Sequence, residues 1–266
     1  MIDNFEFKEK YNVYDLVDII RILRGEGGCP WDMVQTHETI RKDFIEETYE
    51  VIEAINKKNP VMLREELGDV LMQVVFHAQI EAEKGVFDID DVADEICKKM
   101  IVRHPHVFGD VSAESVDDVL TNWDAIKRST KGQKTTSDAI DSIPRELPAL
   151  MRAAKVQHKA AKAGFDWTEI DGALDRLSEE INELRAAIAN GVQEEISDEL
   201  GDVLFSAVNV SRFAAVEAEE ALTQSTDKFI GRFKNVEKMA EERGINMKES
   251  DLSVLDALWD EAKKSK

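Results

Sequence analysis

The sequence predicts an all-helical protein made of two tandem copies of a helical-bundle module. Apolar residues recur at helical spacing, as in the series Leu174, Leu177, Ile181, Leu184 and Ile188. Alternating strand patterns are nearly absent, and only five prolines interrupt 266 residues. These stretches, divided by Gly- and Pro-containing breaks, predict nine or ten helices.

The second module is predicted by an internal repeat. The segment Glu66–Leu71 recurs letter for letter as Glu199–Leu204, 133 residues later. The same offset carries Glu46-Glu47-x-x-Glu50 onto Glu179-Glu180-x-x-Glu183. Further on, a basic pair, a tryptophan and a lysine recur with small shifts of register: Lys99, Arg103, Trp123 and Lys127 match Lys228, Arg232, Trp259 and Lys263.

The repeat sets the expected domain boundaries. We expect an N-terminal module over residues 1–128, a linker over 129–140 and a C-terminal module over 141–266. The polar run from Ser129 to Thr136 lies at the middle of the chain and is the best linker candidate.

Composition narrows the functional classes. With 43% hydrophobic residues the chain can bury a core, and its 34 basic against 55 acidic side chains give a net charge of −21. That surplus argues against general binding to nucleic acid or to an anionic membrane. No stretch of about 20 apolar residues and no signal peptide is present, and the two cysteines suit a reducing compartment, so we expect a cytoplasmic protein.

Paired acids carry the chemistry of the repeat. Residues three apart share one face of a helix. This spacing pairs Glu47 with Glu50, Glu66 with Asp69, Glu180 with Glu183, and Glu199 with Asp202. Four carboxylates facing each other across a helical hairpin repel, and a divalent cation between them removes that cost. Oxygen ligands favour Mg²⁺ first and Mn²⁺ second, and Mg²⁺ completes its shell with phosphate oxygens. The pattern therefore predicts a site that handles phosphates.

A solvated, acid-rich helix surface is the alternative interpretation. Two details favour the metal site. The apolar neighbours Ile45, Tyr49, Val51 and Ile52 place the acids beside a core. Gly68 and Gly201 each cost a helix about 1 kcal/mol relative to alanine, and a close helix–helix approach at the acids would explain that cost. A di-iron site fits less well, because the acid pairs include no Glu-x-x-His.

The pattern E-E-x-x-E followed by E-x-x-D on successive helices resembles the MazG family of nucleoside triphosphate pyrophosphohydrolases. Four further segments look like that family: Gly28–Asp32, Arg103–Phe108, Pro144–Leu150 and Gly164–Trp167. The resemblance implies hydrolysis of nucleoside triphosphates between the α- and β-phosphates, with Mg²⁺, in a helical homodimer. Apolar helix faces in a module of this size also favour a dimer.

The resemblance also implies roles for single residues. It places metal ligands at Glu180, Glu183, Glu199 and Asp202, with the repeat supplying Glu47, Glu50, Glu66 and Asp69 in the first copy. It places nucleotide contacts at Arg176, Lys228, Arg232, Trp259 and Lys263, matched in the first copy by Lys99, Arg103 and Trp123. Candidates for handling the attacking water are Glu179, Glu180 and Glu199.

Elementary chemistry supports these contacts separately. Lys228 and Arg232 are one helical turn apart, so both can approach one phosphate; ion pairing with the surplus acids is the alternative. Trp259 can stack on any base, which predicts broad base selectivity, and a core position in the last helix is its alternative.

The two copies differ at the metal face. Asn209 stands where the first copy has Phe76, and Arg212 where it has Gln79. A polar Asn209 there predicts a ligand contact, whereas Phe76 predicts core. We therefore expect the C-terminal half to be the main catalytic site. The alternative from another functional class is a nucleotide sensor or helical adaptor that binds without turnover.

Overall fold

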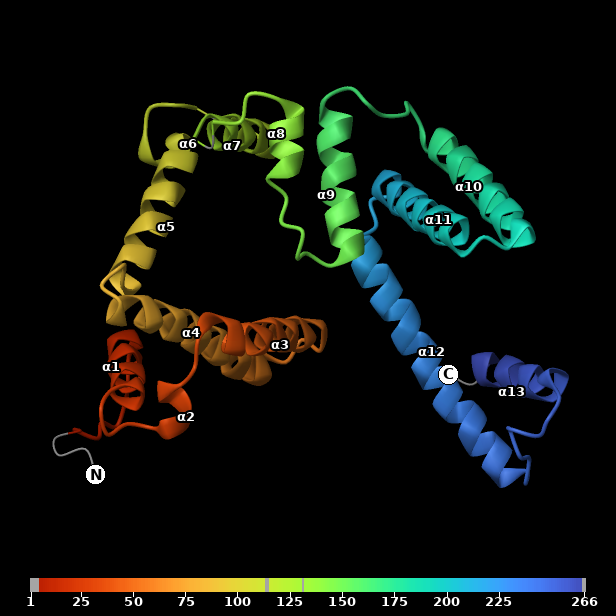
Figure 1. Ribbon diagram of the computed structural model, residues 1–266, viewed down its shortest axis with the longest axis horizontal. Coiled ribbons are helices and arrows are strands. Elements are labelled where there is room, and N and C mark those ends of the chain that lie inside the picture. The colour runs from red at the N-terminus through yellow and green to blue at the C-terminus, as the bar shows by residue number, and fades with distance from the viewer. Residues whose placement is uncertain (1–4, 113–114, 131, 265–266) are drawn as a thin grey trace. The chain divides into compact units, whose positions relative to one another are not determined.

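The computed structural model describes residues 5–112, 115–130 and 132–264, and in these residues the chain is helical with no strand (Figure 1). The thirteen helices of this part are α1 (Val13–Arg24), α2 (Pro30–Met33), α3 (His37–Asn56), α4 (Pro60–Glu83), α5 (Ile89–Arg103), α6 (Pro105–Phe108), α7 (Val116–Thr130), α8 (Thr136–Asp141), α9 (Ala149–Lys162), α10 (Ile170–Asn190), α11 (Gln193–Phe213), α12 (Ala218–Glu242) and α13 (Leu252–Lys264). The all-helical prediction is confirmed. The predicted number was too low because α2, α6 and α8 have only four to six residues each, too few for an apolar periodicity.

Contacts divide the chain into two compact units, Met1–Lys127 and Arg128–Lys266. The segment 129–140, expected to be a linker, holds the end of α7 and most of α8. A side-chain cap begins α8, where the Thr135 hydroxyl accepts a hydrogen bond from the backbone of Asp138. None of the described helices is both long and apolar enough to cross a membrane.

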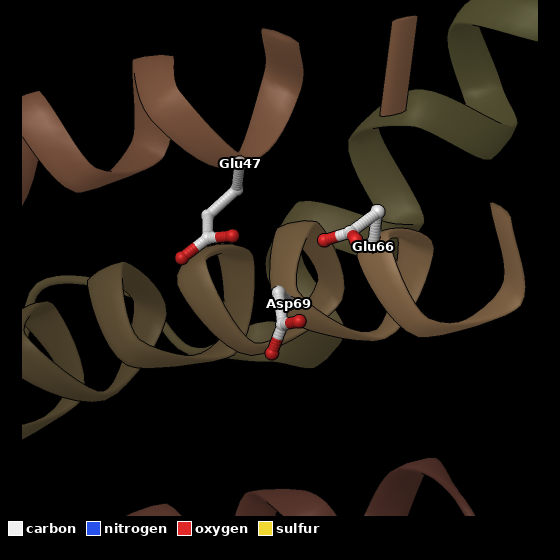
Figure 2. A group of neighbouring side chains, drawn as sticks. All are labelled: Glu47, Glu66 and Asp69. Atoms are coloured by element: carbon white, nitrogen blue, oxygen red, sulfur yellow. The ribbon is translucent and has the colours of Figure 1, made fainter. Parts of the chain in front are cut away.

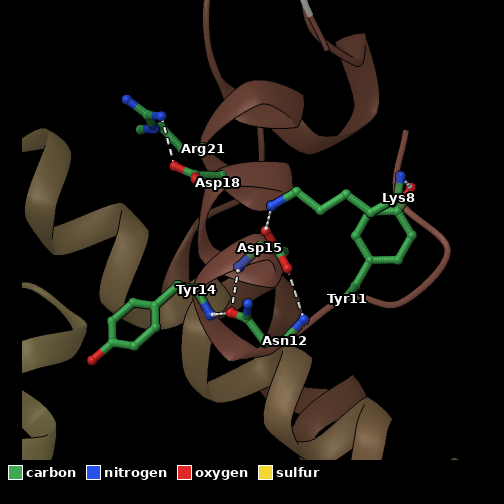
Figure 3. A network of polar contacts seen from close by, with 7 residues as sticks. All are labelled: Lys8, Tyr11, Asn12, Tyr14, Asp15, Asp18 and Arg21. Atoms are coloured by element: carbon green, nitrogen blue, oxygen red, sulfur yellow. Dashed lines mark hydrogen bonds and ion pairs between the residues drawn. The ribbon is translucent and has the colours of Figure 1, made fainter. Parts of the chain in front are cut away.

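The first unit is built on a hairpin of α3 and α4, with α1 packed against α4. Asn12 caps α1, and the Asp15 side chain accepts a hydrogen bond from the Asn12 backbone and pairs with Lys8 (Figure 3). Inside lies a cluster of five buried apolar side chains, Ile20, Ile40, Val75, Phe76 and Ile80. This confirms that Phe76 is a core residue.

The second unit repeats the hairpin as α10 and α11, with α9 packed on α11. The buried Gln157 of α9 donates a hydrogen bond from Nε2 to the Phe205 carbonyl oxygen at 2.8 Å, which ties the two helices together. A separate cluster joins α12 to α13 through Val236, Ala240, Leu258 and Ala262.

The two glycines of the repeated motif do not mark a close helix contact, so that prediction was wrong. Both Gly68 and Gly201 are exposed, and a Cβ added at either one meets no atom within 4 Å. The helix penalty of glycine is therefore not offset by packing within the described part of the chain.

Replacing these glycines is expected to stabilise the fold. Gly68→Ala and Gly201→Ala should each raise the free energy of unfolding by about 0.5–1 kcal/mol, because alanine loses less backbone entropy in a helix and the space is open. Urea unfolding of the single variants measures this, with Gly244→Ala as a control expected to destabilise, since Gly244 has φ +66°. A stability loss at positions 68 and 201 would show that the glycines face a neighbour after all.

The apolar residues beside the first acid pair are not buried in the chain, contrary to expectation. Ile45, Tyr49 and Ile52 are 55%, 50% and 44% exposed, and Val51 is half-buried. The second hairpin likewise exposes Leu200 and Leu204. The two hairpins thus carry apolar faces that the described residues leave uncovered.

Candidate metal centres

The first acid cluster joins α3 to α4. One carboxylate oxygen from each of Glu47, Glu66 and Asp69 lies within 4.8 Å of the other two, and all three side chains are half-buried. Figure 2 shows Glu47 reaching down from α3 toward the two acids of α4. The charge of Glu50, one turn further along α3, adds to burial in raising the pKa of Glu66.

The second cluster repeats this arrangement between α10 and α11. Oxygens of Glu180, Glu199 and Asp202 lie within 4.8 Å of one another. Glu183 is not among these three residues, but its charge adds to burial in raising the pKa of Glu199. The structure therefore brings the predicted acids of each half together across one hairpin.

Glu180 is the most informative residue of the second cluster. Its side chain is only 4% exposed, and its Oε1 atom lies 2.6 Å from Nη2 of Arg176. The Oε2 atom is buried without a hydrogen-bond partner among the described residues. A buried carboxylate oxygen without a partner is costly. A hard divalent cation bound by the neighbouring oxygens removes that cost, so the donor set fits Mg²⁺ or Mn²⁺.

The pKa values of the clustered acids report their crowding. Burial, opposed by Arg176 and reinforced by Glu183 and Asp202, raises the pKa of Glu180. Burial and then the charges of Glu183 and Asp202 raise the pKa of Glu199. In the first half, burial and then Asp69 raise the pKa of Glu47, while burial and then Glu50 raise that of Glu66.

These directions predict how metal stabilisation depends on pH. The raised pKa values mean that the folded state binds protons more tightly than the unfolded state. The contribution of these four acids to the stability of the metal-free protein therefore falls as pH rises from the ordinary value of 4.5 through the raised values. Mg²⁺ binds the ionised acids, so the Mg²⁺-induced rise in melting temperature should be larger at about pH 7.5 than at about pH 5. Thermal melts at both pH values measure it, and an equal shift at both would contradict the assignment.

Arg176 and Glu179 flank the second cluster. Glu179 is exposed and pairs with Nη1 of Arg176 at 3.1 Å, so it points along the helix surface toward the arginine. Its part in positioning water stays a prediction. Arg176 also approaches Glu183 at 3.8 Å.

Four of the predicted nucleotide contacts lie on two helices that pack on each other, with Lys228 and Arg232 on α12 and Trp259 and Lys263 on α13. The Arg232 guanidinium lies 5.9 Å from the centre of the Trp259 ring, and the Phe229 ring lies 5.0 Å from that of Trp259. Lys263 pairs with Asp260 at 2.9 Å. Among the described residues, no ion pair or hydrogen bond joins Lys228 or Arg232 to the acids. The chain thus forms a basic and aromatic group that is distinct from the acid cluster.

The counterpart group in the first unit is similar in kind. The Trp123 ring of α7 packs edge-on against His104 at 5.3 Å between ring centres, and Lys99 and Arg103 lie on α5, which ends just before His104. Arg103 is half-buried and Lys99 is exposed.

Asn209 has a partner that the sequence comparison did not reveal. Its Oδ1 atom accepts hydrogen bonds from Nε and Nη2 of Arg212 at 3.1 and 2.8 Å, and Arg212 pairs with Asp166 at 2.5 Å. The Asn209 carbonyl therefore helps to fasten the loop before α10 to the end of α11. Its predicted contact with a ligand stays a prediction.

One charge difference between the two copies, and one contact between two histidines, were not predicted from the sequence. Asp43 occupies the position 133 residues before Arg176, and the repeat alone makes this difference visible. In the first unit, Nδ1 of His37 lies 2.7 Å from Nδ1 of His77, and Nε2 of His37 lies 2.6 Å from Glu81. The two histidines lie 40 residues apart on different helices, and no local pattern pairs them.

Comparisons with known proteins agree with this duplicated geometry. A MazG nucleotide pyrophosphohydrolase domain matches residues 35–108 and again residues 169–237. The chain is 44% identical over 252 residues to a nucleoside triphosphate pyrophosphohydrolase of Escherichia coli strain K12, covering 94% of this chain and 96% of the relative. It is 45% identical over 249 residues to the nucleoside triphosphate pyrophosphohydrolase/pyrophosphatase MazG of Thermotoga maritima, covering 94% of each. A protein of Bacillus subtilis, called uncharacterized protein YabN, is 47% identical over 250 residues, which are 93% of this chain and 50% of that protein. The chain belongs to the MazG nucleotide pyrophosphohydrolase family.

Proposed function

We propose that this protein hydrolyses nucleoside triphosphates between the α- and β-phosphates, releasing a nucleoside monophosphate and pyrophosphate, with Mg²⁺ as its metal and Mn²⁺ as a substitute. The buried, unpartnered Oε2 atom of Glu180, within a group of carboxylates from two helices, is the observation that carries the proposal. The names of the E. coli and T. maritima relatives support the same reaction.

The acids of the second half hold the metal and handle the water in this proposal. Bound Mg²⁺ supplies charge neutralisation for the phosphate oxygens and lowers the pKa of a bound water. Glu180, Glu199 and Asp202 are the ligands best supported by geometry, with Glu183 at the edge. One carboxylate, with Glu179 as a further candidate, accepts a proton from the water that attacks the α-phosphorus, and the bond from that phosphorus to the bridging oxygen breaks.

The basic group on α12 would receive the leaving pyrophosphate. Lys228 and Arg232 neutralise its developing charge, and Trp259 stacks on the base without reading its edges, which gives broad base selectivity. Because no hydrogen bond or ion pair joins this group to the acids within the described part of one chain, a homodimer would offer another way for the group to reach the phosphates, from one protomer to the acids of its partner. The exposed apolar faces of both hairpins suit such a dimer.

The first half has the same acids but a core phenylalanine, Phe76, where the second has Asn209. We therefore place the main catalytic site in the C-terminal half. The composition suits a cytoplasmic enzyme.

Pyrophosphate release from each common nucleoside triphosphate, with Mg²⁺ and with a chelator, tests the reaction. The proposal expects release from several bases that stops when the metal is removed. Binding of triphosphates without release would favour the sensor or adaptor alternative and would reject the enzyme.

A further inference from the structure

The second acid cluster already contains a cation from its own chain. Arg176 lies one turn before Glu180 on α10, and its guanidinium contacts Glu180 at 2.6 Å, Glu179 at 3.1 Å and Glu183 at 3.8 Å. The side chain is 41% exposed, so it is anchored at its tip rather than locked in the core.

The first cluster has the opposite charge at this position. The residue 133 positions earlier is Asp43, and its charge is among those that raise the pKa of Glu47. The two copies therefore share their acids but differ by two charge units at one point beside them. This exchange distinguishes the two candidate metal sites, whose acids are the same.

We propose that Arg176 is a counter-ion that weakens the binding of free divalent metal at the second cluster, so that metal and nucleotide phosphates enter that site together. The inference rests on the proposed function and goes beyond it, because it assigns Arg176 a role toward the metal and not only toward the phosphates. The unpartnered Oε2 atom of Glu180 marks the ligand position that the arginine leaves open.

The physical reason is electrostatic. A positive charge held within a few ångströms of a divalent cation opposes its binding, and removing that charge near a protein surface strengthens binding by about tenfold. A triphosphate offers Arg176 a replacement partner with more negative charge than Glu180. Once the guanidinium turns to the phosphates, the acids lose their counter-ion and bind metal more tightly. Metal and nucleotide then strengthen each other's binding, as linkage requires.

Metal titration of the full chain tests this. A Glu47→Gln, Glu66→Gln double variant removes acids of the first cluster, so that Mn²⁺ binding reports on the second cluster. Titration calorimetry with Mn²⁺ alone then compares the Mn²⁺ affinity of this background protein with that of the same protein carrying Arg176→Gln. We expect about tenfold tighter Mn²⁺ binding with Arg176→Gln. Arg185→Gln is the matched control, because Arg185 is exposed on the opposite face of α10, nine residues or two and a half turns away, and it should leave the affinity unchanged.

Coupling is measured by repeating the titration with a triphosphate analogue whose α,β-bridge is a methylene group. The analogue should tighten Mn²⁺ binding in the background protein and should do so by a smaller factor in the Arg176→Gln variant. Melting temperatures give an independent readout: Arg176→Gln should lower the melting temperature without metal and enlarge the rise that Mn²⁺ produces.

Two results would overturn the inference. Unchanged Mn²⁺ affinity with weaker analogue binding would make Arg176 a phosphate contact only, and weaker Mn²⁺ binding would make it a support that positions Glu180. Failure of the proposed function would give a different result. In that case Glu180→Gln and Glu199→Gln would leave the Mn²⁺ affinity unchanged, because these acids would not be metal ligands.

Discussion

Glu180→Gln is expected to lower the rate of pyrophosphate release by at least about 100-fold, the range seen when a group that stabilises the transition state is removed. The change keeps the shape of a side chain that is 4% exposed but removes its charge. The Oε2 atom of Glu180 accepts no hydrogen bond in the described structure, so replacing the carboxylate by an amide breaks no hydrogen bond at that atom. Loss of a metal ligand, rather than loss of packing, is therefore the expected effect.

Steady-state assays at saturating Mg²⁺ measure this effect, and circular dichroism checks that the variant is folded. Asp175→Asn is the control, because Asp175 is an exposed acid on the same helix, five residues or about 140° around from Glu180. Glu47→Gln, the same change in the first half, should leave most of the activity. A variant at position 180 that retains full turnover would reject the C-terminal site, and equal losses at positions 47 and 180 would make the halves equivalent.

Arg24→Ala is expected to destabilise the first unit by about 3 kcal/mol, since it removes a buried, paired charge and leaves its partners unsatisfied. The side chain is 5% exposed and makes two hydrogen bonds of 2.8 Å to the Glu83 carboxylate. It also donates to the carbonyls of Asp32 at 2.7 Å and Gln35 at 3.1 Å. Arg24 thus ties α1, the α2 loop and the end of α4 to one another, over the face of the Phe76 ring.

Chemical denaturation with hydrogen exchange resolved on α1 to α4 measures the loss within this unit. Arg21→Ala is the control on the same helix, where the Arg21–Asp18 pair is exposed (Figure 3). That control should change the stability by no more than about 0.5 kcal/mol. Equal effects at positions 21 and 24 would mean that the buried contacts of Arg24 contribute little.

The helical fold was predictable from the local periodicity of apolar residues, and the duplication was predictable from the exact spacing of the repeated motifs. The acids of each half were predictable for the same reason: residues three apart on a helix share a face, and a short connection returns the next helix beside the first. The core position of Phe76 also followed, since an apolar residue two turns beyond Asp69 sits where the second helix meets its neighbours.

Contacts between distant segments were not predictable in this way. The bridge from Arg24 to Glu83 and the link from Arg212 to Asp166 join residues 59 and 46 positions apart, and such pairings depend on how helices pack. The role given to Gly68 and Gly201 failed because a residue's helix penalty does not reveal which side of the helix has a neighbour. Lys228 and Arg232 share a face as expected, but spacing alone could not say how they lie with respect to the acids.

The central claim is that the repeated acid groups hold divalent metal between two helices of one hairpin. Anomalous diffraction from crystals grown with Mn²⁺ and a non-hydrolysable triphosphate tests it most directly. We expect a manganese peak bounded by oxygens of Glu180, Glu199 and Asp202, with phosphate oxygens completing the coordination shell of the metal. Those three side chains directed to solvent, with no peak between α10 and α11, would contradict it.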